Sequence, residues 1–512
     1  MAERRVTTAS SVTAEGGFPN HLPNEIVAKI FLAGTEIWRE LDPLGFPFPV
    51  LVSGVCSHWR LLSQGTPELW TFLLPQLRND PEECLRWTSN WLERSGAMLV
   101  SIVIDDRTAS GPENLDTLML TRSIVGILGL VANNIHRLHR LDILTTDSST
   151  FEDFTKNLNH ASHLRHLSLC ARNSALPFSS FVKSPENSRW SSLQLLPSLA
   201  SFRFQNISPP LVSNITSLNA HSLQLDYEDV QKLFTACPNL ADLVLPKVLP
   251  ISGPIPTRST PIEVPSLRSI AVSSHSIRPE TQAIYLFSFI VVPNLVYLEV
   301  EGNVRTALLF SSSLSSSKLR TLRVAHCSRF SFHPQGKEDI KFYQSFSTLH
   351  HLELIRAPAG ELLLKTSADR PRLERRRSIN LRMPTYRDRP IGLGNEGIST
   401  SSLQSAESQM LWPELRSITL DSFLTDDLVS LVSFAKIHED LQSIRLSKPA
   451  MRHLSESLRR NGDVVFTPPS RRQSPGIGSN DVQGTKDVRE WLSESVQLGL
   501  VQEPSHGLLE AE

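Results

Sequence analysis

Histidines and a cysteine gather in one short stretch of the chain, where their spacing raises the question of a zinc site. These residues are His160, His163, His166 and Cys170. Imidazole and thiolate groups are preferred zinc ligands. However, His163 and His166 flank a predicted strand, and side chains three residues apart on an extended chain point to opposite faces. His136 and His139 have the same spacing. We therefore predict no metal site and no cofactor.

Two pairs of neighbouring carboxylates could in principle act as general acid and base. They are Asp105-Asp106 and Asp426-Asp427, at loop-like or helix-start positions. Such positions favour solvated or helix-capping groups over catalytic ones. The sequence also has no glycine-rich phosphate loop, nucleophile elbow or dinucleotide-binding turn. We expect that the protein is not an enzyme.

The composition restricts the class of partner and the compartment. A formal net charge of −1 gives no general attraction to nucleic acid or to an anionic membrane. The longest apolar stretch, residues 283–292, is far shorter than the roughly 20 residues of a membrane span, and residues 1–17 lack the apolar core of a signal peptide. The five cysteines are scattered and odd in number, which favours free thiols in a reducing compartment. We expect an intracellular protein, in the cytoplasm, the nucleus or both, without membrane or nucleic-acid partners.

Two short amphipathic helices are predicted near the start of the chain. The first opens at Pro23 and carries Ile26, Ile30 and Phe31 on one side. The second covers residues 52–62, in which the apolar residues have helical spacing. Two such helices cannot bury their apolar faces fully against each other, so some of this surface should remain for a partner.

The same residues resemble a known family. Leu-Pro-x-Glu-Ile-x-x-x-Ile-Phe at 22–31, Val-Cys-x-x-Trp-Arg at 55–60 and Thr-Pro-Glu-Leu-Trp at 66–70 are similar to the F-box of fungal F-box proteins. The resemblance implies a three-helix module that docks on the Skp-type adaptor of a cullin–RING ubiquitin ligase. The spacer 33–49 is longer than in a minimal F-box. By residue match, the implied adaptor-binding residues are Leu22, Pro23, Ile26, Ile30, Phe31, Val55, Cys56 and Trp59.

A repeat fills most of the remaining chain, with the pattern apolar-x-x-apolar-x-apolar. Successive copies are most often separated by about 24 to 30 residues, the period of a leucine-rich repeat. The copies begin at Leu99, Leu138, Leu164, Leu199, Leu240, Leu267, Leu295, Leu319, Leu349, Leu415 and Leu441, with a weaker copy at Ile215. The alternation at the end of each copy predicts a short strand with one face in the core.

Helical sequences lie between some copies, such as residues 227–234, where Val230, Leu233 and Phe234 share one face. A repeated strand-and-helix unit stacks on its neighbours into a curved solenoid. We therefore expect an α/β protein, a small all-α F-box module followed by a leucine-rich-repeat solenoid, an irregular right-handed α/β horseshoe. This resembles the divergent repeats that follow many F-boxes, although their regular asparagine is mostly missing.

One further helix is predicted from Pro81 to Gly96, between the first module and the repeats. Cys84, Trp87 and Trp91 lie at near-helical spacing within it. We interpret this helix as a rigid coupling, because an adaptor works by positioning its target.

An arginine-rich insertion interrupts the repeats after the Leu349 copy. Residues 370–389 contain eight arginines, including Arg375-Arg376-Arg377, which Ser378 follows directly. The composition is typical of a solvated, disordered loop; a nuclear-localisation patch, a site for an acidic partner and a kinase target at Ser378 remain open. The predicted organisation is a disordered N-terminus 1–17, F-box 18–72, helical linker 73–96, solenoid 97–358, disordered basic insertion 359–410, last repeats 411–460, and a mostly disordered tail 461–512 with a possible helix at 487–498.

The outward residues of the strands are the candidates for target binding. They are Arg140, Asp142, Arg203, Gln205, Tyr297, Glu299, Arg323, His351, Glu353 and Arg445. The main hypothesis is a substrate-recognition adaptor of a Skp–cullin–F-box ubiquitin ligase, whose partners are the Skp-type adaptor, through it the cullin and RING subunits, and an unknown protein target. The alternative is an interaction scaffold that sends nothing for degradation.

Overall fold

The computed structural model describes two compact units of the chain. The first comprises residues 1–176 and 184–210, and the second residues 177–183 and 211–512. The described residues are 22–41, 45–77, 80–106, 117–146, 154–171, 196–205, 212–221, 227–246, 261–274, 290–302, 318–327, 346–357, 412–421, 440–447 and 497–501, with 431, 434, 435, 438 and 450. Each unit is treated by itself below.

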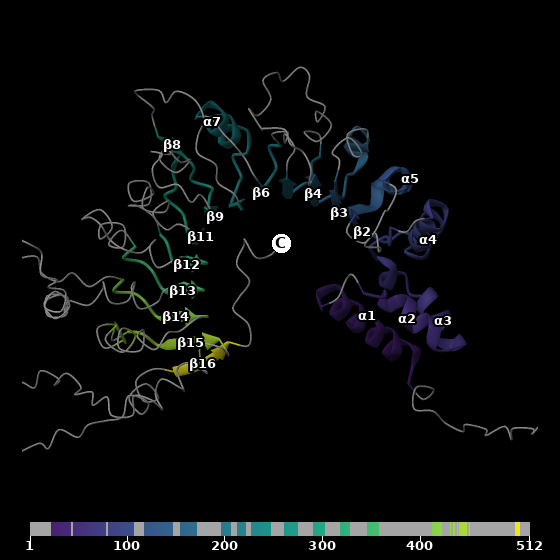
Figure 1. Ribbon diagram of the computed structural model, residues 1–512, viewed down its shortest axis with the longest axis horizontal. Helices are drawn as coiled ribbons and strands as arrows, with labels where there is room; N and C mark the ends of the chain where they lie inside the picture. Colours follow the sequence, from purple (N-terminus) through teal and green to yellow (C-terminus); the bar gives the residue numbers. More distant parts are fainter. Residues whose placement is uncertain are drawn as a thin grey trace, which may run out of the picture. The chain divides into compact units, whose positions relative to one another are not determined.

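The first unit opens with a helical module (Figure 1). It consists of α1 (Asn24–Leu41), α2 (Phe48–Val55), α3 (Ser57–Gln64) and the 3-10 helix η2 (Pro67–Trp70). The predicted single helix over 52–62 is wrong, because Cys56 is extended, with φ −157 and ψ 171, and divides it into α2 and α3. The Cys56 Sγ accepts a hydrogen bond from the Trp59 N–H at 3.4 Å, so it caps α3.

Aromatic side chains hold the helical module together. Phe31 on α1 meets Trp59 on α3 edge to face at a ring-centroid distance of 5.0 Å. Trp38, about two turns further along α1, packs on Phe72 at a ring-centroid distance of 5.7 Å. Trp70 is completely buried, and its indole N–H donates to the Ser63 carbonyl at 2.8 Å.

The predicted coupling helix is present as α4 (Pro81–Arg94). The Asp80 carboxylate caps its start by accepting the Glu82 and Glu83 N–H groups at 3.0 and 3.3 Å. At its end, buried Arg137 donates to the Leu92 carbonyl at 2.6 Å and to the Ser95 hydroxyl at 2.7 Å. A cation on the last carbonyls of a helix is favourable, so Arg137 ties α4 to the following sheet.

Five parallel strands complete the first unit. They are β1 (Phe72–Leu73), β2 (Val100–Asp105), β3 (Leu138–Thr145), β4 (His166–Ala171) and β5 (Ser201–Gln205), with α5 (Thr117–Asn133), η4 (Ile135–Arg137) and η5 (Leu158–His160) between them. The repeat positions are in register, Leu141 with Leu167 and Leu167 with Phe202. Strand β1 was not predicted. It joins the sheet directly after the helical module, with Phe72 opposite Ser101.

The second unit is built on a longer run of parallel strands, which lie side by side in Figure 1. In spatial order they are β6 (Ser217–His221), β7 (Asp242–Leu245), β9 (Ser269–Ser274), β11 (Tyr297–Gly302), β12 (Thr321–Ala325), β13 (His351–Ile355), β14 (Ser417–Leu420), β15 (Ser443–Ser447) and β16 (Gln497–Val501). Helix α7 (Tyr227–Ala236) precedes β7, and β8 (Ile262–Glu263) pairs with β10 (Ile290–Val291). The chain is thus a mixed α/β protein with parallel sheet.

Every predicted copy of the repeat is a strand, including the weak copy at Ile215, which becomes β6. The second apolar position pairs across the unit, for example Leu298 with Leu322 and Leu322 with Leu352. Because these side chains are buried and their strands are adjacent, the repeat pattern itself sets the register.

Several predicted segments lie outside the described residues. These are the disordered N-terminus, the insertion 359–410 and most of the tail. The strands on either side of the insertion pair directly, Leu352 opposite Ile418. The possible helix at 487–498 is described only at its last two residues, which belong to strand β16 instead. Within the described part of the chain, no helix is long and apolar enough to cross a membrane.

Candidate functional site

The helical module exposes many large apolar side chains, and this exposed apolar face is the first candidate site. Ile26 and Ile30 on α1 are 42% and 52% exposed, and Val55 on α2 is 61% exposed. An apolar surface of this kind on a folded module marks a site of protein interaction. The members of the exposed apolar face are Leu22, Ile26, Ile30, Ile37, Leu41, Phe46, Leu51, Val55 and Leu61.

Helix α1 has two apolar sides rather than one, which corrects the sequence analysis. Phe31 was predicted to share a face with Ile26 and Ile30, yet it is fully buried together with Val27 and Trp38. Of the eight implied adaptor-binding residues, Phe31 is therefore in the core and Trp59 is half-buried against it. The other six, Leu22, Pro23, Ile26, Ile30, Val55 and Cys56, are exposed.

A close approach between α1 and α2 sets the form of this module. A Cβ on Gly34 would overlap the Phe48 Cζ atom. Glycine at this position therefore allows the start of α2 to pack directly on α1. The sequence analysis did not identify Ile37, because it ended the first helix near Phe31 and treated the spacer 33–49 as a loop. It also did not identify Leu51, just before the predicted second helix, or Leu61, within it.

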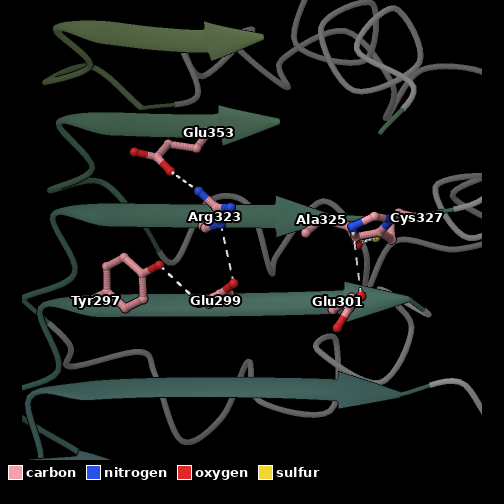
Figure 2. Close-up of polar contacts among 8 residues, drawn as sticks. Tyr297, Glu299, Glu301, Arg323, Ala325, Cys327 and Glu353 are labelled. Atoms are coloured by element: carbon pink, nitrogen blue, oxygen red, sulfur yellow. Dashed lines mark hydrogen bonds and ion pairs between the residues drawn. The ribbon is translucent and has the colours of Figure 1, made fainter. Parts of the chain in front are cut away.

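The second candidate is the outward face of the strands in the second unit, where charged residues meet across β11, β12 and β13 (Figure 2). Arg323 lies between two carboxylates: its Nε is 3.3 Å from Glu299 Oε1, and its Nη1 is 2.9 Å from Glu353 Oε2. The Tyr297 hydroxyl donates to Glu299 Oε2 at 3.1 Å. Burial, and then the Glu299 carboxylate, raise the pKa of Tyr297, so it stays protonated as the donor.

These charged residues are buried, although they were predicted as contacts for a target. The side chains of Glu299 and Arg323 are completely inaccessible and that of Glu353 is 19% exposed. Buried charges persist in proteins when they are paired. In this conformation, Glu299 and Arg323 therefore connect neighbouring strands and offer no surface to a partner.

Other predicted target-binding residues do reach the surface. His351 and Arg445 are exposed, and the His351 Nδ1 lies 2.6 Å from the Ser417 hydroxyl. Burial, followed by the charges of His350 and Arg445, lowers the pKa of His351. Arg203 and Gln205 on β5 are half-buried.

Three residues of the first unit form a Ser–His–Asp arrangement that the sequence analysis missed. His166 Nε2 lies 3.0 Å from Asp142 Oδ1, and its Nδ1 lies 3.0 Å from the Ser201 hydroxyl. Arg140 Nε also contacts Asp142, at 2.7 Å from Oδ2. Nucleophilic catalysis further needs backbone or side-chain donors aimed at a developing oxyanion. The Ser201 N–H donates to the Arg165 carbonyl at 2.9 Å, so it is not available as such a donor.

The remaining residues with chemically reactive side chains are the paired aspartates and the cysteines. Asp105 and Asp106 were predicted to be solvated or helix-capping groups. Both are buried, so the solvated alternative is wrong. Asp426 and Asp427 lie outside the described residues. All five cysteines are free, and burial raises the pKa of Cys237 to about 11 and that of Cys327 to about 12. Among the described residues, no group of three or more histidine, cysteine, aspartate or glutamate side chains is placed so that it could hold a metal ion.

Comparison with known proteins adds no identification. No protein family matches this chain, and no curated protein is significantly similar to it.

Proposed function

We propose that this chain is a substrate-recognition adaptor of a Skp–cullin–F-box ubiquitin ligase. In this proposal, α1 to α3 form an F-box that docks on the Skp-type adaptor, and the strands belong to a leucine-rich-repeat solenoid that holds a protein target. The carrying observation is the exposed apolar face, because six of the eight residues implied by the F-box resemblance are exposed in a module that otherwise has a buried core. The transfer chemistry would belong to enzymes bound through the cullin and RING subunits.

The free energy that this surface offers to a partner can be estimated from the side chains that the partner would bury. Burying a large aliphatic side chain contributes about 1.5 to 3 kcal/mol. Ile26, Ile30 and Val55 still expose 42%, 52% and 61% of their surface, so complete burial by a partner would contribute roughly 1 kcal/mol for each. Interfaces commonly depend on a few such side chains. The stiff connection through α4 and Arg137 supports a positioning role, since it fixes the helical module to the sheet of its own unit.

Co-purification of the full chain with the Skp-type adaptor tests the docking step. We expect wild type to bind the adaptor, and Ile26→Asp with Ile30→Asp to weaken binding at least about a hundredfold, as for central contacts of other interfaces. The matched control places the same charges on exposed apolar residues of α5, Leu118→Asp with Val125→Asp. Absence of binding by wild type, or equal losses in both variants, would refute docking through this face.

Ubiquitylated proteins compared in cells with and without the chain separate the adaptor from the scaffold. We expect at least one protein to lose ubiquitylation when Ile26→Asp with Ile30→Asp replaces wild type. If the adaptor binds but no ubiquitylation changes, the non-degradative scaffold is the better account.

A further inference from the structure

Arginines recur at one position of the repeat in the second unit. This position follows the first apolar residue of each copy, directly before the strand. Its described occupants are Thr216, Ala241, Arg268, Val296, Arg320, His350, Arg416 and Gln442. Three are arginine, one is histidine and none is acidic. Since the position belongs to the same edge of every parallel strand, its side chains form a row, here called the arginine edge.

Backbone hydrogen bonds place the members of the arginine edge in register. The His350 N–H donates to the Arg320 carbonyl at 2.8 Å, and the Arg416 N–H donates to the His350 carbonyl at 2.9 Å. One strand lies between Arg268 and Arg320, and one between Arg320 and Arg416. With neighbouring strands about 4.8 Å apart, successive arginines of the row are spaced by about 10 Å.

Among the described residues, little negative charge lies close to the arginine edge. Arg268, Arg320 and Arg416 are exposed, and none makes an ion pair or side-chain hydrogen bond within the described part of the unit. Lys318 adds a further exposed cation, 3.4 Å from the Asn294 amide oxygen. An acidic side chain also reaches the row, since Glu414 Oε2 lies 3.8 Å from His350 Nε2. Counted over the residues that the structure describes, the edge has a net positive charge.

We propose that the arginine edge binds an acidic segment of the protein target, with carboxylates at every third residue. A polyproline II segment has three residues per turn and a rise of about 3.1 Å per residue, so every third side chain lies on one face about 9 Å apart. That interval matches the spacing of the arginines. Arginine is also suited to carboxylate recognition, because its planar group can donate two parallel hydrogen bonds. This inference rests on the proposed function, since it names the chemistry of the target.

A polypeptide fits this edge better than single-stranded nucleic acid. Proteins that bind single strands combine cations with aromatic side chains on which bases stack. The described positions of the arginine edge contain no tyrosine, phenylalanine or tryptophan, and the uncharged members between the arginines include Val296. An acidic peptide needs cations alone.

Fluorescence anisotropy with the full chain and a labelled peptide Glu-Pro-Pro-Glu-Pro-Pro-Glu tests the inference. We expect saturable binding that weakens with added salt, and about tenfold weaker binding by Arg268→Gln with Arg320→Gln and Arg416→Gln, from three exposed ion pairs of modest strength. The matched control removes three exposed arginines elsewhere, Arg86→Gln with Arg122→Gln and Arg356→Gln, and should bind like wild type.

Two further probes determine the identity of the ligand. A peptide of equal composition with its three glutamates adjacent should bind at least about threefold more weakly, since only one or two carboxylates can then reach arginines. Equal binding by both triple variants, equal binding of both peptides, or no saturable binding by wild type would overturn the inference. Tighter binding of a single-stranded oligonucleotide through the same arginines would replace the acidic target by nucleic acid.

Co-purification of each triple variant with the Skp-type adaptor is measured in parallel. If adaptor binding is lost while peptide binding is retained, the result counts against F-box docking and not against the arginine edge.

Discussion

The helical module and the strands β11 to β13 both depart from the usual pattern of apolar residues inside and charged residues outside. The module has apolar side chains at the surface, and the strands have charged side chains in the interior. The helical module exposes Ile26, Ile30 and Val55, whereas the strands bury Glu299 and Arg323. Exposed apolar groups contribute little to folding and are available to a partner. Buried charges support the fold only as pairs and are not available to a partner. Burial, more than residue type, therefore separates candidate binding residues from structural ones in this chain.

The largest expected effect is on the buried ion pairs. Arg323→Ala would leave the Glu299 carboxylate buried without this cation, which should lower the free energy of unfolding by about 3 to 5 kcal/mol. Arg445→Ala removes an exposed arginine of the same sheet and should change it by less than about 0.5 kcal/mol. Denaturant unfolding of both variants measures the difference. Similar stabilities would mean that Arg323 is not structural.

A second buried ionisable group should make the second unit sensitive to acid. His438 is 2% exposed and stacks on Phe434 at 4.1 Å. Burial lowers the pKa of His438 to about 4, against about 6.5 in an unfolded chain. The unfolded state therefore binds the proton first, and stability should fall by up to about 3 kcal/mol as the pH drops from about 6.5 to about 4.

Unfolding measured across this pH range should show a smaller acid loss for His438→Leu than for wild type. His163→Leu removes an exposed histidine and serves as the control. If all three proteins lose stability in parallel, His438 is not the group that titrates.

The contact between α1 and α2 should be intolerant of one added carbon. Gly34→Ala forces its Cβ against the Phe48 ring and should cost about 1 to 3 kcal/mol. Gly54→Ala, on α2, meets no atom within 4 Å, and should stabilise the helix by up to about 1 kcal/mol. Thermal unfolding distinguishes them, and a tolerated alanine at Gly34 would show that the helices can separate without cost.

Of these predictions, substitutions on the exposed apolar face should change the stability least. Ile26→Asp with Ile30→Asp should change the free energy of unfolding by less than about 1 kcal/mol, because about half of each side chain is already exposed to solvent. Phe31→Asp, one residue beyond Ile30 but in the core, should unfold the module instead. Circular dichroism during denaturation compares the two. Comparable destabilisation would place Ile26 and Ile30 in the core.

The strands were predictable because the repeat leaves buried residues at fixed spacing. Leu298, Leu322 and Leu352 are recognisable in sequence and are opposite one another in the sheet. The faces of α1 were not, since Ile26 and Ile30 have the same four-residue spacing as Val27 and Phe31, and periodicity alone cannot say which pair faces inward.

The break at Cys56 and the burial of Arg323 were also beyond sequence reasoning. The first depends on one extended residue inside an apolar run of helical spacing. The second depends on what surrounds the outward face of the strands, which alternation along a strand does not reveal. Both are properties of tertiary packing rather than of local pattern.

Amide hydrogen exchange of the full chain, with and without the Skp-type adaptor, tests the contrast between the two regions most directly. We expect the adaptor to slow exchange in residues 24–64 of the helical module and to leave strands β11 to β13 unchanged. The same protection should be absent in Ile26→Asp with Ile30→Asp. Adaptor-induced protection confined to the strands, or none in wild type, would contradict the account.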